Sequence, residues 1–261
     1  LLSAASAELR DLDHLLQQVH TGEQVEIHNA TEDRGVIVLA GPRARDVLGS
    51  LTDASLESAD FPWRSAQEID IAGIGTLALR INYVGELGWE LHPPMADLPA
   101  LYTALWSAGE AYGIADFGLY ALNSLRMEKA YRGWGAELTN EVTMLEADMA
   151  RFFGSAKEDF VGKTATETGE VGPLRLVYFE VDAENADVRG GEPIFLNDAC
   201  IGVTTSGGYG YAVEKSLGFG YVPPEQSAPG SVMDIGLLDA RCRATVLAEP
   251  IYDPANERLA S

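Results

Sequence analysis

The chain has 261 residues, more than most single domains contain, so we expect either one large domain or two medium ones. Its 40 acidic and 18 basic residues give a net charge of −22. So negative a chain is a poor candidate for wrapping nucleic acid, because such binding depends mainly on neutralised phosphates. No apolar run approaches the ~20 residues of a membrane-spanning helix, so we expect no membrane span.

Cysteine and histidine spacing gives no sign of a metal site. Cys200 and Cys242 lie far apart in strand-like runs without a C-x-x-C motif, so we interpret them as structural thiols in a reducing compartment. A disulfide or a metal site is the alternative. H-x-x-x-H and H-x-E spacings are absent around the four histidines, which are His14, His20, His28 and His92.

Helix and strand patterns alternate in the first part of the chain. Residues 6–20 carry leucines at helical spacing, so we expect an amphipathic helix that packs on a sheet. Further strands are expected at residues 24–28, 34–40, 68–71 and 76–83, with a helix at residues 43–51 after Gly41-Pro42. This order predicts an α+β arrangement with helices on one side of a sheet.

The stretch INYVGELGWELH, residues 81–92, is the first that suggests a site. Gly85 and Gly88 tolerate the backbone of a tight hairpin between two short apolar segments. Glu90 stands between Trp89 and Leu91, so strand alternation places its carboxylate on the opposite face. The spacing alone favours an exposed glutamate, because glutamate is rarely buried without a partner, and leaves a binding site as the alternative.

Two helices are expected next, a core helix at residues 98–112 and a second at residues 119–132. Arg126 borders the apolar face of the second helix. That face is formed by Leu119, Leu122 and Ala130. Such an arginine either extends its charged end to solvent, forms a structural ion pair or contacts a ligand. We interpret Glu128 and Arg132 as an exposed i, i+4 pair.

The last third of the chain is rich in short strands. They are expected at residues 174–181, 192–196, 200–206, 217–222 and 241–249. Their spacing and turns predict a small antiparallel barrel or sandwich, so we place a domain boundary in the polar stretch 157–172. Glycines at residues 207–211, GGYGY, are read as a barrel turn in preference to a phosphate-binding loop, because no helical pattern follows.

Several segments together resemble the folate-binding aminomethyltransferase family, that is the glycine-cleavage T-protein and its relatives. They are LAGPRARDVL at residues 39–48, NYVGELGWEL at 82–91, ALNSLRMEKAYRGWG at 121–135, LTNEVTMLEA at 138–147, DFVGK at 159–163 and GFGYVPPE at 218–225. The match is collinear over essentially the whole chain. Residues 116–141 are most similar to the C-terminal folate domains of dimethylglycine and sarcosine dehydrogenases or oxidases.

The resemblance implies an α+β fold with two domains. Residues 1–156 would form a T-protein-like folate-binding domain, with a mixed sheet and packed helices, that lacks its N-terminal part. Residues 157–261 would form a small antiparallel β-barrel. A protein of this kind is expected in the cytoplasm, or in the mitochondrial matrix of a eukaryote.

The family's folate-binding positions carry over onto three residues. Glu90 is similar to the family glutamate whose carboxylate accepts hydrogen bonds from the 2-amino and N3 donors of the pterin. Tyr83 is similar to a tyrosine at the wall of the folate cavity, and Arg126 to an arginine near the folate. The catalytic aspartate of the family has no counterpart in this chain, so the catalytic residues are unknown. The resemblance implies no metal.

The implied function is tetrahydrofolate-dependent one-carbon transfer. An N-methyl amine such as dimethylglycine or sarcosine would supply the methylene unit, giving 5,10-methylenetetrahydrofolate in a flavin-dependent dehydrogenase or oxidase. Because the chain begins with Leu1, we expect the catalytic aspartate and an FAD domain on preceding sequence or on a partner flavoprotein. Folate and a small amine are the expected ligands, with neither nucleic acid nor membrane as a partner.

Three alternatives remain open from the sequence. The chain could be a free-standing glycine-cleavage aminomethyltransferase, or a folate-dependent demethylase that transfers methyl from a sulfonium or methoxy group. A third alternative is a non-catalytic folate-binding protein of iron–sulfur maintenance. Those proteins carry a K-G-C-Y segment, where this chain has KAYR at residues 129–132, which makes the third alternative the weakest.

Overall fold

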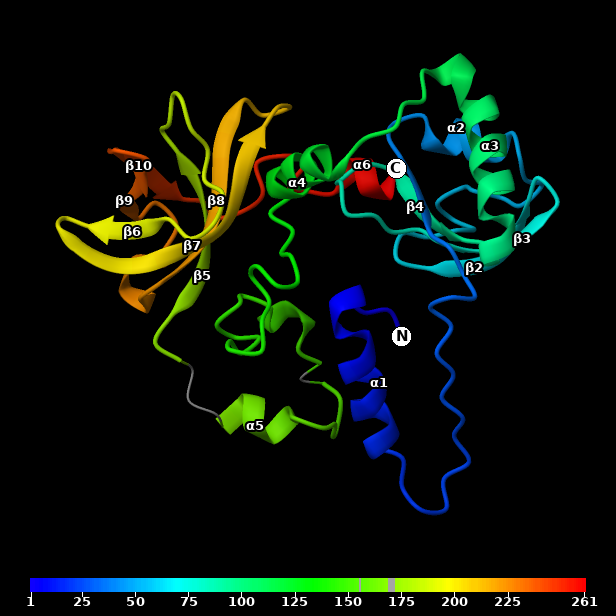
Figure 1. Cartoon of the computed structure of the whole chain (residues 1–261), viewed down its shortest axis with the longest axis horizontal. Helices are drawn as coiled ribbons and strands as arrows, with labels where there is room; N and C mark the ends of the chain where they lie inside the picture. Colours follow the sequence, from blue (N-terminus) through cyan, green and yellow to red (C-terminus); the bar gives the residue numbers. More distant parts are fainter. Residues whose placement is uncertain (155, 169–171) are drawn as a thin grey trace. The chain divides into compact units, whose positions relative to one another are not determined.

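The computed structural model describes residues 1–154, 156–168 and 172–261 (Figure 1). These residues divide into two units by their internal packing. The first comprises Leu1–Asn82, Glu86–Ala115 and Arg258–Ser261, and the second Tyr83–Gly85 and Asp116–Glu257. Because this division reflects packing alone, the domain division at residues 156 and 157 stays a prediction. Part of the polar stretch placed at that boundary, residues 169–171, lies outside the described residues.

A four-stranded antiparallel sheet organises the described part of the first unit. Its order is β1 (Ile37–Ala40), β4 (Gly88–His92), β3 (Ile74–Leu79) and β2 (Ala66–Ile71). Helices α2 (Ala44–Gly49) and α3 (Leu98–Gly109) lie together on one face of the sheet (Figure 1). Trp89 and Leu91 of β4 point to that face and are fully buried in its apolar core. This arrangement confirms the expected helices on one side of a sheet.

The hairpin between β3 and β4 is confirmed, but its connection is longer than a tight turn. β3 ends at Leu79, and residues 80–87 lead to β4. The backbone turns at Arg80, where the N–H of Ile81 donates back to the carbonyl oxygen of Leu79 at 2.9 Å. Arg80 itself is 1% exposed, and its Nη1 donates to the carbonyl oxygen of Phe61 at 2.6 Å. The expectation of a strand through Tyr83 was therefore wrong.

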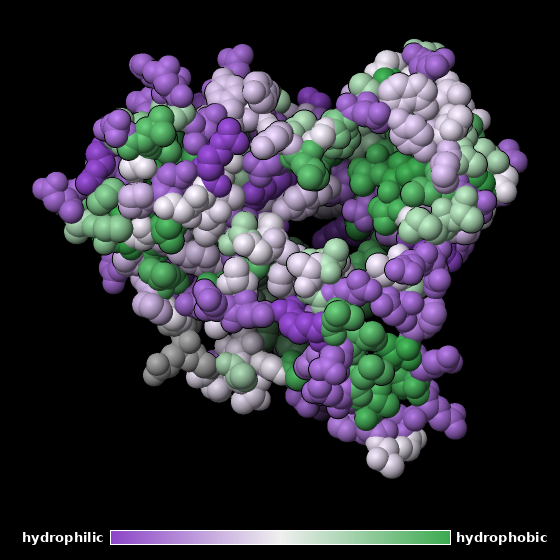
Figure 2. Space-filling model, viewed as in Figure 1, coloured by the Kyte–Doolittle hydropathy of each residue, from purple (hydrophilic) through white to green (hydrophobic). Residues whose placement is uncertain are grey.

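The N-terminal segment forms the expected helix without the expected packing. After η1 (Ala5–Ala7), α1 spans Glu8–Gln17 and contains no buried residue. Leu9 and Leu16 are 78% and 53% exposed, and Figure 2 shows hydrophobic residues gathered on the surface around this helix. The strand expected at residues 24–28 does not form, because this segment has little apolar surface to bury: Val25 is 57% exposed.

The second unit contains a closed antiparallel barrel, which confirms the barrel prediction. Among the described residues its strand order is β10-β5-β8-β7-β6-β9. The strands are β5 (Arg175–Val181), β6 (Pro193–Leu196), β7 (Ala199–Gly210), β8 (Lys215–Val222), β9 (Val232–Leu237) and β10 (Ala240–Val246). Strand β9 was missed by the sequence patterns. Buried aliphatic and aromatic side chains such as Phe179 and Ile194 fill the barrel interior.

The glycines at residues 207–210 lie inside strand β7, so their interpretation as a turn was wrong. They permit close packing against the strand. A Cβ on Gly207 would lie 2.5 Å from Cβ of Val188, and one on Gly210 would lie 2.8 Å from Cγ of Glu128. The chain turns after Gly210, before β8 begins at Lys215.

Helix α4 (Leu119–Glu128) packs on β7 in the second unit. The remaining helical segments are η2 (Met95–Asp97), η3 (Glu110–Tyr112), η4 (Ala150–Phe152), α5 (Lys163–Thr168), η5 (Pro224–Gln226) and α6 (Glu257–Ala260). In the part of the chain that the structure describes, every helix is too short or too polar to cross a membrane.

Candidate functional site

Glu90 and His92 occupy the face of β4 opposite the apolar core. Strand alternation requires this, since Trp89 and Leu91 point into the core. The register places Val38 of β1 and Leu79 of β3 directly beside Glu90, so its immediate neighbours on the sheet are apolar. The Glu90 side chain is 24% exposed. A largely shielded carboxylate therefore stands on a partly apolar sheet face.

The Glu90 carboxylate makes no hydrogen bond with the described residues. Within 4 Å, its one ion-pair contact among them is Nε2 of His92, 3.6 Å from Oε2, which is longer than a hydrogen bond. Both carboxylate oxygens therefore keep their capacity to accept hydrogen bonds. A ligand with two adjacent N–H donors matches this acceptor pair.

Glycine is required at the two positions of this segment for different structural reasons. Gly85 adopts φ 80°, a left-handed conformation that a side chain disfavours. Gly88 lies against β1, where an added Cβ would be 2.5 Å from the carbonyl oxygen of Leu39. Asn82 Nδ2 donates to the carbonyl oxygen of Glu86 at 2.6 Å and so closes the connection between the two strands. These contacts determine the path that leads into Glu90.

Arg126 in α4 is buried and forms a structural ion pair. Its Nη1 lies 3.0 Å from Oε2 of Glu137 and donates to the carbonyl oxygen of Tyr131, also at 3.0 Å. Its Nε donates to Oδ1 of Asn123 at 3.0 Å. Of the alternatives left open by the sequence, the ion pair is thus the one observed. Nη2 makes no hydrogen bond with the described residues.

Glu137 is the centre of this cluster. Its side chain is fully buried and accepts hydrogen bonds from the backbone N–H of Gly133 at 2.7 Å and from Thr205 Oγ1 at 2.6 Å. Ser206 Oγ also donates to the carboxylate. The carboxylate therefore connects α4, the segment after it and strand β7. The sequence patterns missed Glu137, since an ion pair was one of the alternatives for Arg126 but spacing could not select the partner among many acids.

Tyr83 lies in the same cluster. Its hydroxyl donates to the carbonyl oxygen of Arg132 at 2.6 Å, and its ring stacks on Tyr131 with centroids 5.7 Å apart. Burial raises the pKa of the Tyr83 phenol, an effect that Arg126 opposes and Glu137 reinforces. The phenol is therefore neutral at neutral pH. The structure thus brings Tyr83 and Arg126 together in the second unit, whereas Glu90 belongs to the first.

The expected exposed pair of Glu128 and Arg132 was wrong. Glu128 is 1% exposed and accepts a hydrogen bond from the backbone N–H of Ala212 at 2.7 Å. Arg132 pairs with Asp148. Helix α4 ends at Glu128, and Ala130 adopts φ 51°, so the two side chains do not share one helix face.

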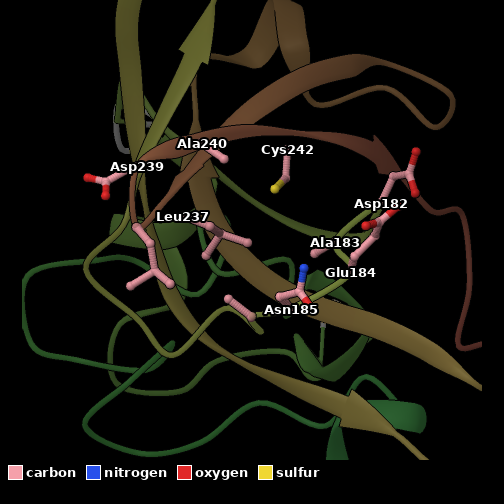
Figure 3. A pocket seen from close by; sticks show the side chains of 10 residues that line it. Asp182, Ala183, Glu184, Asn185, Leu237, Asp239, Ala240 and Cys242 are labelled. Carbon is pink, nitrogen blue, oxygen red and sulfur yellow. The ribbon is translucent and has the colours of Figure 1, made fainter.

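A separate pocket opens beside the barrel (Figure 3). It has a volume of about 560 Å³ and is lined by the segments Asp182 to Ala186 and Leu237 to Ala240, together with Cys242. Figure 3 shows Asp182 and Asp239 on opposite sides of it. Its lining contains acids and no base, which disfavours anionic ligands, and it includes none of Glu90, Tyr83 and Arg126. In the described residues, no group of three or more His, Cys, Asp or Glu side chains could hold a metal ion.

Comparison with known proteins places the chain in a family. Residues 1–157 match the GCVT N-terminal domain, and residues 175–253 match the glycine cleavage T-protein C-terminal barrel domain. A solved structure of the glycine cleavage system aminomethyltransferase T from Bartonella henselae has the same fold. It superposes with a TM-score of 0.81 at 24% identity, covering 96% of this chain and 67% of that one. The predicted T-protein-like α+β fold with a following antiparallel barrel is therefore confirmed.

Relatives of two kinds are similar in sequence. Human mitochondrial dimethylglycine dehydrogenase is 39% identical over 99% of this chain and 31% of its own length. Mouse mitochondrial sarcosine dehydrogenase is 32% identical over 90% of this chain and 26% of its length. The chain thus spans about a third or less of these dehydrogenases. An aminomethyltransferase of Listeria monocytogenes is 31% identical over 98% of this chain and 69% of its length. Since the N-terminal domain match covers more than half of its residues, the chain belongs to the glycine cleavage T-protein family of aminomethyltransferase-type enzymes.

Proposed function

We propose that the chain binds tetrahydrofolate and serves as the one-carbon acceptor part of a flavin-dependent enzyme that demethylates an N-methyl amine. The substrate class is that of dimethylglycine and sarcosine. Membership of the T-protein family supports the folate, and the match of dimethylglycine dehydrogenase over 99% of the chain supports the amine class.

The observation that carries this proposal is the unbonded carboxylate of Glu90. A pterin presents a 2-amino group and N3–H side by side, and a carboxylate accepts both through its two oxygens. The side chain is 24% exposed, and its sheet neighbours Val38 and Leu79 suit the faces of an aromatic ring. A neutral amide at this position could accept only one of the two hydrogen bonds.

The other two residues have complementary roles. Nη2 of Arg126 is available to an acceptor atom of the folate, because Glu137, Tyr131 and Asn123 use the other guanidinium nitrogens. Tyr83 contributes a wall of the cavity with its ring, because its hydroxyl hydrogen is donated to the carbonyl oxygen of Arg132. Neither residue transfers a proton in this role, so the catalytic residues remain unassigned.

When bound, tetrahydrofolate supplies the N5 nucleophile, and the product would be 5,10-methylenetetrahydrofolate. The residues of this chain bind and orient the folate. Oxidation of the amine would need FAD on another part of a longer polypeptide or on a partner flavoprotein, because this chain corresponds to only 31% of the human dehydrogenase. The mitochondrial relatives support a mitochondrial location for a eukaryotic protein. For a bacterial protein the proposed location is the cytoplasm.

The test has two stages. The full chain is first titrated anaerobically with tetrahydrofolate by calorimetry, and we expect saturable one-to-one binding. The chain is then assayed with its flavoprotein part and dimethylglycine, and the folate product is identified. 5,10-Methylenetetrahydrofolate would support the proposal. Formation of 5-methyltetrahydrofolate would exclude methylene transfer, and binding without turnover would favour a non-catalytic folate-binding protein.

A second candidate function is that of a free-standing aminomethyltransferase. The Listeria monocytogenes aminomethyltransferase favours it, because this chain covers 69% of that protein. Such an enzyme would need no flavin. Folate-dependent release of ammonia from an aminomethyl donor without a flavoprotein would support this function over the oxidative one.

A further inference from the structure

His92 contains a buried nitrogen without a partner. The residue is 6% exposed, and its Nε2 makes no hydrogen bond with the described residues. Nearly all buried polar atoms in proteins are hydrogen-bonded, so an unpartnered one needs an explanation. The carbonyl oxygen of His92 accepts a hydrogen bond from Nη1 of Arg34 at 3.0 Å, so the ring is not required to satisfy it.

The nitrogen faces Glu90. His92 and Glu90 are two residues apart on β4 and share one face of the sheet, and Nε2 lies 3.6 Å from Oε2. The register places Leu77 directly across from His92 and Leu79 across from Glu90. Neither leucine offers an acceptor. Among the described residues, the Glu90 carboxylate is the acidic group within 4 Å of the ring nitrogen.

A small movement converts this contact into a hydrogen bond. The 3.6 Å separation exceeds the usual N–H···O length of about 2.9–3.0 Å by roughly 0.6–0.7 Å, and rotation about the side-chain bonds of a glutamate covers that difference. A carboxylate held in this way loses rotational freedom before a ligand arrives. The ordering that ligand binding would otherwise require is then already made.

We propose that His92 is a positioning residue that holds the Glu90 carboxylate, through N–H donation from Nε2, in the orientation that accepts the paired N–H donors of the ligand. This role rests on the proposed function of Glu90 and extends it to a residue that makes no contact with the ligand itself. It requires the ring proton on Nε2. Oε2 has a second lone pair, so donation from His92 leaves both oxygens able to accept from the ligand.

Three substitutions separate this role from that of a histidine that only fills space. His92→Leu keeps the volume and removes the donor. His92→Gln restores an N–H donor near the position of Nε2, whereas the shorter His92→Asn carries a donor that does not reach Glu90. Thr76→Val is the matched control, because Thr76 is buried in the neighbouring strand β3 and its hydroxyl bonds to the carbonyl oxygen of Ile74.

Tetrahydrofolate affinity of the full chain is measured by anaerobic calorimetry, with thermal unfolding as the check on folding. We expect His92→Leu and His92→Asn to weaken binding by about five- to tenfold, the scale of one hydrogen bond. His92→Gln should restore affinity to within about twofold of the parent, and Thr76→Val should leave it unchanged. If His92 had only a structural role, folate affinity would not be restored by glutamine and left weak by asparagine.

A double-mutant cycle with Glu90→Ala completes the test. We expect His92→Leu to have no further effect on folate affinity once Glu90 is absent. Suppose that Glu90→Ala weakens folate binding but His92→Leu lowers folate affinity by the same factor in the parent and in the Glu90→Ala variant. The positioning role is then overturned and the proposed function stands. If Glu90→Ala leaves affinity unchanged, both are overturned. Should His92→Leu fail to fold, the comparison of His92→Gln with His92→Asn decides alone, and equal affinities of these two variants would overturn the role.

Discussion

The Oε2 atom of Glu137 lies 3.0 Å from Nη1 of Arg126, and both side chains are buried in the second unit. Each charge has lost most of its hydration, so each depends on the other and on the surrounding hydrogen bonds. Gly133, Thr205 and Ser206 supply those bonds to the carboxylate. The pair therefore holds α4 against strand β7 and orients the arginine proposed to meet the folate.

Replacing Glu137 should destabilise the fold severely. Glu137→Ala leaves the buried Arg126 charge unpaired, so we expect a loss of about 3–5 kcal/mol in the free energy of unfolding. Urea denaturation followed by circular dichroism measures it. Glu180→Ala is the control, because its pair with Lys215 is 3.0 Å long but lies at the surface, and its loss should cost under about 1 kcal/mol. Equal losses in the two variants would contradict the role of burial.

Replacing Glu90 should weaken folate binding and leave the fold intact. Glu90→Ala removes a charged acceptor for two hydrogen bonds, so we expect tetrahydrofolate affinity to fall by about 1.5–3 kcal/mol, roughly 10- to 150-fold. Glu68→Ala is the matched control, since Glu68 lies on β2 of the same sheet with 63% of its side chain exposed. Calorimetric titration measures both variants. A parental affinity for Glu90→Ala would show that Glu90 is a strand residue with no part in folate binding.

Gly88 should not tolerate a side chain. In Gly88→Ala the new Cβ would lie 2.5 Å from the carbonyl oxygen of Leu39 and 2.8 Å from Cα of Ala40, and neither backbone atom can move without disturbing β1. We expect a loss of about 1–3 kcal/mol in stability, as for overpacked cores, and weaker folate binding. Gly75→Ala on β3 meets nothing within 4 Å and is the control. Thermal unfolding of the two variants checks this, and matching Tm values would show that β1 accommodates the methyl group.

Glu192 should make stability fall in acid. Burial raises the pKa of its carboxyl, but hydrogen bonds from Thr204 and from the backbone N–H groups of Gly190 and Arg189 together outweigh burial and lower it. A depressed folded-state pKa contributes stability above the unfolded-state value of about 4.5, and that contribution disappears as pH falls through the folded-state pKa. We expect Glu192→Gln to be less stable near neutrality and to show a shallower loss between about pH 5 and 3. Urea midpoints across this range measure the slope, and parallel curves would contradict the prediction.

Local patterns were sufficient wherever burial follows periodicity. The alternation of Trp89, Glu90 and Leu91 correctly predicted which side chains enter the core, and the apolar helix beginning at Leu98 was found where expected. The barrel was also anticipated from strand spacing, with β9 missed. The candidate site residues were recognised by resemblance to a family, and their role in folate binding remains a proposal.

Periodicity failed on α4 because this helix packs through polar groups. Its apolar Leu119 is 83% exposed, whereas Glu128 is buried because it accepts N–H groups from the chain after β7. Asn123 and Ser124 likewise donate to carbonyl oxygens of β7. Hydropathy predicts that a polar side chain stays exposed because burial would remove its hydrogen bonds to water. On α4, backbone groups distant in the sequence supply those hydrogen bonds instead, so the polar side chains are buried.

The sequence by itself thus determined the helices on one side of a sheet, the following barrel, the hairpin that carries Glu90 and the family to which the chain belongs. Only the tertiary structure decided that Glu137 is the partner of Arg126, eleven residues away, and that the buried ring of His92 faces Glu90. The physical reason is that hydrophobic periodicity is a local property of the residues within one strand or helix. Pairing between polar side chains depends instead on distances and desolvation, which exist only after the chain has folded.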